Sequence, residues 1–136
     1  MFIVIDGIDW SWKWTQVELI SNYLKEIWKN VLVLDFPRYG KKSAFMVEKY
    51  LNWEYWKDIS AKKASIFFAI DRFEAMKDLE KDFYSYDFIL SNRYVSANMI
   101  HQAWKIRDDQ ERKEFLDWLQ DLEYNIFWIP KPDKTI

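Results

Sequence analysis

The chain has 136 residues, which fits a single domain, and its 20 basic and 22 acidic residues leave a formal net charge of −2. With no cysteine and a single histidine, His101, it excludes disulfides, thiolate metal sites and histidine-rich metal sites. Nothing in this balance indicates a nucleic acid or an anionic membrane as partner, because both select for clustered positive charge. No apolar run reaches the roughly 18 residues of a membrane helix and no signal peptide is recognisable, so we expect a cytoplasmic protein.

Strands and helices alternate along the chain. Short apolar runs rich in β-branched residues predict buried strands, and apolar residues at helical spacing predict the segments between them. In chain order we expect a strand at 2–6, a helix at 13–27, a strand at 31–34, helices at 43–51 and 60–82, a strand at 87–90, helices at 96–106 and 109–123, and the start of a strand at 135–136. This alternation favours an α/β fold with a central parallel sheet flanked by helices on both faces.

Glycine and tryptophan are used abnormally. The chain has two glycines and nine tryptophans, whereas average usage would supply about nine or ten glycines. Trp53 follows Asn52 where an Asn-Gly turn would be natural, and Trp28 stands at a predicted helix end. We therefore predict that tryptophan replaces glycine at Trp10, Trp12, Trp14, Trp28, Trp53, Trp56, Trp104 and Trp128.

Trp118 differs from these, because it lies in a helical pattern where glycine would cost about 1 kcal/mol, and we expect it to be a true tryptophan. A genetic code in which UGA specifies glycine explains the pattern most simply. A natural tryptophan-rich protein is the alternative.

The segment between the first strand and the first helix has the spacing of a phosphate-binding loop. Such a loop reads G-x-x-x-x-G-K-[ST], and Gly7 and Lys13 stand six residues apart as it requires. Backbone N–H groups and a helix N-terminus hold the phosphate, and the lysine reaches the outer phosphates. Trp12 and Trp14 break the pattern, but glycine at 10, 12 and 14 restores it as G-I-D-G-S-G-K-G-T-Q. The expected ATP phosphate-binding residues are Gly7, Trp10, Ser11, Trp12, Lys13, Trp14 and Thr15, with Thr15 also a candidate magnesium ligand.

Four further motifs resemble, in order, those of the thymidylate kinase family of P-loop nucleoside-monophosphate kinases. They are FPRYGKKS with YLNWEYW (36–43 and 50–56), FFAIDR (67–72), NRYVSAN (92–98) and LEYNIFWIPKPD (122–133). The resemblance covers the whole chain and implies a P-loop NTPase fold. It also implies transfer of a phosphoryl group from ATP, with Mg²⁺, to dTMP in dTTP biosynthesis, and a homodimer.

By resemblance, one set of residues binds the nucleoside of dTMP. Phe68 would stack on thymine, Arg72 would reach a thymine carbonyl and Asn98 would bond the base edge, while Asp9 would accept a bond from the 3′-hydroxyl. Three of them also have an ordinary interpretation: Phe68 as core, Arg72 as a surface ion-pair residue, and Asp9 as a loop or helix-cap residue. His101 is expected to be an ordinary helix residue near the site.

A second set binds phosphate. The resemblance assigns Arg93, with Arg38 and Tyr39, to the monophosphate, and makes Lys13 and Arg93 the catalytic residues. Arginine suits phosphate through its bidentate fork, and phosphoryl transfer asks mainly for positioning and charge neutralisation. Arg93 follows a strand, and ligands of open α/β sheets bind at the carboxyl ends of the strands.

The chain departs from the family pattern in two places. Asn92 stands where the family usually has an aspartate that helps to organise magnesium. The chain also stops at Ile136 in what should be a core strand, so we expect one P-loop kinase domain over 1–136 without its lid and final strand, and little activity from the chain as printed. Another nucleoside or deoxynucleoside monophosphate kinase, or a non-catalytic nucleotide-binding remnant, is the alternative.

Overall fold

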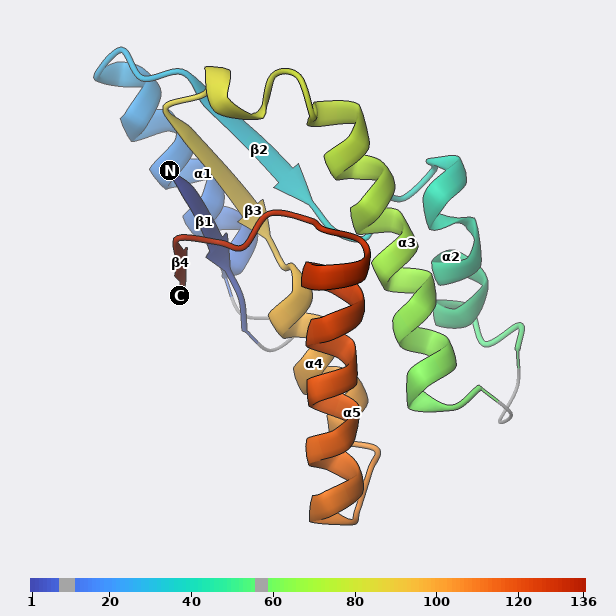
Figure 1. Cartoon of the computed structure of the whole chain (residues 1–136). Coiled ribbons are helices and arrows are strands. Elements are labelled where there is room, and N and C mark those ends of the chain that lie inside the picture. Colours follow the sequence, from blue (N-terminus) through green and yellow to red (C-terminus); the bar gives the residue numbers. More distant parts are fainter. Residues whose placement is uncertain (8–11, 56–58) are drawn as a thin grey trace.

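A computed structural model describes residues 1–7, 12–55 and 59–136 of the chain (Figure 1). Four parallel strands form one sheet in the order β2-β3-β1-β4. Short 3₁₀ helices at Lys42–Ala44 and Phe83–Ser85 and a π-helical turn at Leu122–Ile126 join the main elements. Those elements are β1 (Phe2–Ile5), α1 (Lys13–Glu26), β2 (Val31–Asp35), α2 (Phe45–Leu51), α3 (Ala61–Leu79), β3 (Phe88–Asn92), α4 (Val95–Ala103), α5 (Asp109–Asp121) and β4 (Lys134–Thr135).

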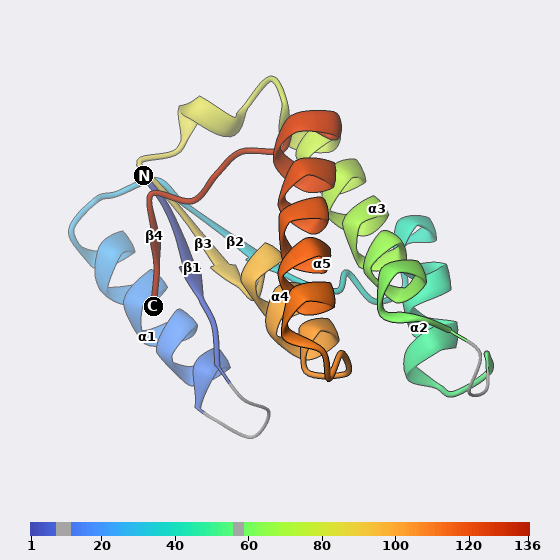
Figure 2. The ribbon, with the colours of Figure 1, turned by 60° about the horizontal axis from the view of Figure 1, so that its bottom comes forward.

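Helices cover both faces of the sheet, which confirms the predicted layering (Figures 1 and 2). Alternate residues of a strand point to opposite faces. Ile3 and Ile5 of β1 pack with α1 in one core cluster, whereas Phe2 and Val4 belong to a second cluster that includes residues of α3 and α4. On this second face α5 packs outside α4, and α2 packs beside α3.

The predicted elements are all present and differ from the observed ones mainly at their ends. β3 runs two residues further than predicted, to Asn92, because its whole length pairs with β2 on one side and β1 on the other. The start of a strand predicted at 135–136 is confirmed as β4, which pairs with β1. Among the described residues, no helix has both the length and the apolar character needed to cross a membrane.

A buried ion pair joins α3 to the turn after α5. Arg72 and Glu123 have side chains only 2% and 0% exposed. Arg72 Nε donates to Glu123 Oε2 at 2.9 Å, and Nη2 donates to the other oxygen of the same carboxylate. Arg72 Nη1 also lies 3.5 Å from the carbonyl oxygen of Tyr94, just before α4. One guanidinium therefore connects three segments that are distant in the sequence.

Three tryptophans have a backbone that favours glycine. The φ angles of Trp28, Trp53 and Trp128 are 62°, 62° and 55°, in the left-handed region. Each follows a helix C-cap, where Schellman-type closure calls for this conformation and glycine is the usual residue. After α1, for example, the N–H of Lys29 reaches back to the carbonyl of Leu24 at 3.0 Å. These angles support the prediction of glycine at the three positions.

The other suspected positions that the structure describes do not show this signature. Trp104, the C-cap of α4, has right-handed helical angles, and Trp12 has a φ of −62°. Trp10 and Trp56 lie outside the described residues. Trp118 packs in α5 with its ring 6.0 Å from that of Phe115, as expected of a true tryptophan.

Removing the buried charge partner of Arg72 tests the importance of the ion pair. We expect Glu123→Gln to lower the free energy of unfolding by about 3 kcal/mol or more, because it leaves a buried guanidinium without a counter-charge. Urea denaturation measures the change. Glu80→Gln, which breaks the exposed pair with Lys77, is the control and should cost less than about 1 kcal/mol. Equal effects of the two variants would contradict this account.

The tryptophan positions can be compared in the same assay. Trp28→Gly should raise the free energy of unfolding by about 1 kcal/mol, because it removes the penalty of a left-handed backbone. Trp104→Gly is the matched control: Trp104 is also at a helix end and 88% exposed, but it is right-handed, so glycine should not stabilise it. A stabilisation of the same size in both variants would show that loss of the exposed indole, rather than backbone strain, is responsible.

Candidate functional site

The carboxyl ends of β1, β2 and β3 bring polar residues to one edge of the sheet. β2 ends at Asp35 and β3 at Asn92, and Ile5 of β1 is in register with Asn92. Arg93 follows with a φ of 63°, its N–H donating to the carbonyl of Ile5 at 3.0 Å and its carbonyl accepting from the Ser91 hydroxyl at 2.7 Å. These bonds hold Arg93 in a conformation that non-glycine residues rarely adopt, a kind of strain often found at functional sites.

The predicted phosphate loop leaves the same edge. Lys13 is buried at the start of α1, and its Nζ donates to the carbonyl oxygen of Gly7 at 2.9 Å. The Asp6 carboxylate accepts from the N–H of Gly7 at 3.1 Å and from the hydroxyl of Ser96 in α4 at 2.5 Å. The two ends of the loop motif are thus close together, and Ser96 anchors the start of the loop to α4.

Three other predicted loop residues, at 12, 14 and 15, are exposed to solvent. Trp12 and Trp14 are 78% and 46% exposed, and Thr15 is exposed on α1. Asp9, Trp10 and Ser11 lie outside the described residues. The structure therefore shows the lysine and first glycine of the motif together, and the predicted loop contacts at 9–11 stay predictions.

A pocket lies between α4, α3 and α2, beside Arg93. The side chain of Phe68 lines it, with the ring of Tyr50 edge-on at 5.9 Å between centroids. The Phe36–Pro37 peptide bond, which is cis, lies on its wall. The lining residues are Phe36, Pro37, Tyr50, Leu51, Phe68, Arg72, Arg93, Tyr94, Ala97, Asn98, His101, Gln102 and Lys105.

Buried polar side chains line this pocket, Asn98 and Arg72 among them. Asn98 is 4% exposed, its Nδ2 donates to the carbonyl of Ser65 at 3.2 Å, and its Oδ1 is buried with no hydrogen-bond partner. Leaving such an acceptor unpaired costs about 1–3 kcal/mol, so a ligand that donates a hydrogen bond here would gain affinity. Arg72 also lines the pocket, oriented by Glu123. Beside it, burial raises the pKa of Tyr94, whose neutral hydroxyl donates to the carbonyl of Pro130 at 3.0 Å.

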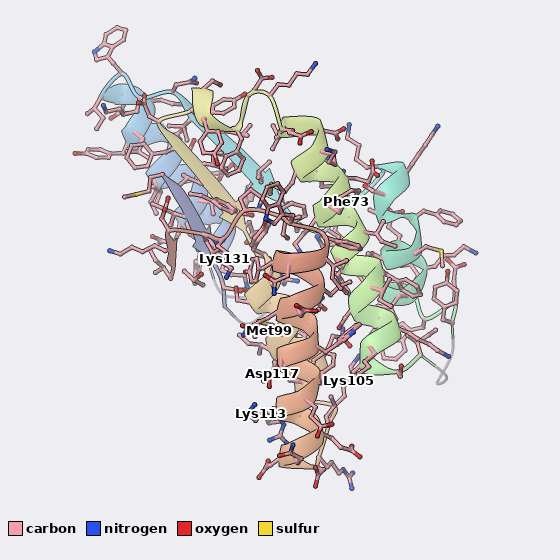
Figure 3. All side chains as sticks on the ribbon, in the orientation of Figure 1. Phe73, Met99, Lys105, Lys113, Asp117 and Lys131 are labelled. Atoms are coloured by element: carbon pink, nitrogen blue, oxygen red, sulfur yellow. The ribbon has the colours of Figure 1, made fainter. Side chains whose placement is uncertain are left out.

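Lys105 lies at the pocket, beyond the end of α4. Its Nζ donates to Gln102 Oε1 at 2.9 Å and to the hydroxyl of Tyr50 in α2. In Figure 3 Lys105 lies on the side of α4 and α5 that faces α3. The sequence interpretation missed Gln102 and Lys105 and treated His101 as an ordinary helix residue. Their spacing from Asn98 was the available signal, because positions three, four and seven residues apart share one helix face.

Arg38 and Tyr39 are not brought to the pocket. Arg38 Nε donates to Asp71 at 3.2 Å, Nη1 to Asp78 at 3.0 Å and Nη2 to Ser43 at 3.0 Å. The side chain of Tyr39 is 66% exposed. Of the predicted dTMP-binding residues, the pocket gathers Phe68, Arg72, Arg93 and Asn98.

Comparison with known proteins agrees with this geometry. The family model for "Thymidylate kinase" matches residues 5–136. The thymidylate kinase of Mycobacterium tuberculosis (strain H37Rv) is 31% identical over 135 residues, which cover 98% of this chain and 63% of that protein. That of Plasmodium falciparum is 26% identical over 117 residues, covering 80% of this chain and 55% of its own length. The chain thus spans less than two thirds of the length of these curated relatives.

Solved structures show the same fold. The crystal structure of thymidylate kinase from Ehrlichia chaffeensis matches with a TM-score of 0.71 at 26% identity, over 99% of this chain and 72% of that one. Thymidylate kinase from Candida albicans matches with a TM-score of 0.77 at 24% identity, over 98% of this chain and 60% of its own. The predicted P-loop NTPase fold is therefore confirmed. The family match over residues 5–136, together with these relatives, shows that the chain belongs to the thymidylate kinase family.

Proposed function

We propose that this protein transfers a phosphoryl group from ATP to dTMP, giving dTDP for dTTP biosynthesis. One observation carries the proposal. The pocket with Phe68 and the unpaired Asn98 oxygen lies beside Arg93, at the sheet edge from which the Gly7–Lys13 loop leaves. The Arg93 N–H donates to the carbonyl oxygen of Ile5 in β1, which supports a proposal in which the acceptor pocket adjoins the phosphate loop.

The pocket suits a pyrimidine base. Phe68 offers an aromatic face for stacking, which is worth about 1–3 kcal/mol per base in single-strand binders. Asn98 Oδ1 can accept a hydrogen bond from the ring N–H of thymine, and the Arg72 guanidinium can donate to a thymine carbonyl. Glu123 holds Arg72 in place before any ligand binds, so less side-chain freedom is lost on binding.

Phosphate groups would lie along the sheet edge. Arg93 would hold the monophosphate, while Lys13 would exchange its bond to Gly7 for the phosphates of ATP. Asp9 would take the 3′-hydroxyl. Arg38 and Tyr39 stay proposed monophosphate contacts. To reach the ligand, Arg38 would have to give up its bond to the exposed Asp78 and also its bond to the buried Asp71.

Magnesium fits this site as part of the nucleotide rather than as a resident ion. Within the described residues, no three His, Cys, Asp or Glu side chains gather to hold a metal. Asn92 Oδ1 is buried without a partner at the sheet edge, and Thr15 carries a hydroxyl in the first turn of α1. The Thr15 hydroxyl could complete a shell made mostly of phosphate and water, as Mg²⁺ prefers, and Asn92 Oδ1 could accept a hydrogen bond from such a water. The ion would neutralise phosphate charge. By resemblance to the family we also propose a cytoplasmic homodimer.

Binding of dTMP tests the acceptor pocket. Asn98→Ala should weaken dTMP binding by about tenfold, and Phe68→Ala by a similar factor, because each removes a contact worth about 1–3 kcal/mol. Isothermal titration calorimetry of the 136-residue chain measures both.

The matched control is Asn125→Ala, which loses only an exposed bond to Asp121 and should leave dTMP affinity unchanged. Titrations with dUMP, AMP and thymidine in the same assay separate the proposed substrate from those of related kinases. Tighter binding of AMP than of dTMP would contradict the proposal.

The phosphate loop gives a second test. The variant with W10G, W12G and W14G should bind ATP at least about tenfold more tightly than the chain as printed, because glycine at these positions restores the phosphate-loop motif. Adding Lys13→Ala to that variant should abolish the gain, since the lysine reaches the outer phosphates. Fluorescence titration with a labelled ATP measures both. Unchanged ATP affinity in the triple variant would argue for a chain that does not use this loop.

A further inference from the structure

An aspartate and an asparagine lie side by side at the carboxyl ends of two neighbouring strands. Asp35 ends β2 and Asn92 ends β3, and the two are partners in the parallel register. Asn92 Nδ2 donates to Asp35 Oδ1 at 2.7 Å. They are 57 residues apart in the sequence, and the sequence interpretation gave no role to Asp35.

This bond fixes which way the Asn92 amide points. An ionised carboxylate only accepts hydrogen bonds, so the amide must turn its NH₂ group toward Asp35. Its oxygen, Oδ1, is then directed away from Asp35, and this oxygen is buried with no hydrogen-bond partner. The sheet edge thus presents an oriented acceptor with an anionic group directly behind it.

The acceptor lies where phosphates are proposed to bind. Asn92 is in register with Ile5 of β1, two residues before Gly7, and directly precedes Arg93. A phosphate oxygen is itself an acceptor and would not bond Oδ1. A water on the divalent cation carried by a nucleotide would, because metal-bound water is a strong donor.

We propose that Asp35 is a positioning residue that orients Asn92 and lends it negative charge, so that Oδ1 accepts a hydrogen bond from water on the nucleotide-bound cation. The inference rests on the proposed function. The Asp35–Asn92 pair acts as a single carboxylate would: Asp35 on β2 carries the negative charge, and Asn92 on β3 provides the oxygen that contacts the water. Partners that orient metal-site groups in this way typically change metal affinity by about 10–100-fold when they are lost.

A swap of the two side chains tests this arrangement. Asp35→Asn should weaken the affinity of the ATP complex for Mn²⁺ by about tenfold. The reason is that an amide at position 35 neither fixes the orientation of Asn92 nor supplies negative charge. The double variant D35N/N92D keeps one amide–carboxylate bond across the strands and should recover most of that affinity. Electron paramagnetic resonance of free Mn²⁺ reports these affinities without any turnover. The background is the variant with glycine at 10, 12 and 14.

Two controls separate this role from stability and from the proposed function. Asn125 Nδ2 donates to Asp121 Oδ1 at 2.8 Å in a similar exposed pair on another part of the molecule, so Asp121→Asn should leave Mn²⁺ affinity unchanged. Asp35→Asn should also leave dTMP affinity and the thermal midpoint near those of the parent. Suppose that the parent binds both ATP and dTMP. If Asp35→Asn then has the same Mn²⁺ affinity as the parent, or if D35N/N92D binds Mn²⁺ as weakly as Asp35→Asn does, only the role of Asp35 is overturned. A parent that binds neither nucleotide overturns the proposed function and this inference together.

Discussion

The buried ion pair between Arg72 and Glu123 joins the parts of the molecule that shape the pocket. Arg72 comes from the middle of α3, Glu123 from the turn after α5, and the carbonyl of Tyr94 from the start of α4. Burying two charges costs free energy that their attraction only partly returns, so the pair does not by itself explain stability. What it provides is position: the guanidinium that lines the pocket cannot shift without leaving a charge unpaired.

The pocket wall that Arg72 forms lies next to the carboxyl ends of the strands, where the other candidate site residues gather. Parallel strands all present their carboxyl ends on the same side, so Asp6, Asp35 and Asn92 and the residues after them meet there. The left-handed backbone at Arg93 and the bond from Ser96 to Asp6 join this edge to α4, which carries Asn98. The proposed base site and the described residues of the proposed phosphate site therefore lie next to each other, as phosphoryl transfer requires.

Glycine is expected at the suspected tryptophan positions for two different reasons, one conformational and one chemical. At Trp28, Trp53 and Trp128 the chain closes a helix with a left-handed residue, and a bulky side chain there is strained wherever its ring points. In the phosphate loop the argument is chemical, since Trp12 has an ordinary φ and the difficulty is the bulk of indoles where a phosphate should approach. Two independent physical reasons thus lead to the same substitution.

The sequence by itself determined the strands and the α-helices, because those follow from local periodicity. It also identified the loop spacing and the four pocket residues Phe68, Arg72, Arg93 and Asn98 through motifs. The tertiary structure alone decided which side chains pair. Arg72 meets Glu123 across 51 residues and Asn92 meets Asp35 across 57, while Asp71 and Asp78 of α3 hold Arg38 away from the pocket. Periodicity encodes which face of an element is apolar, whereas the choice among several charged partners depends on distances and burial that arise only when the elements pack.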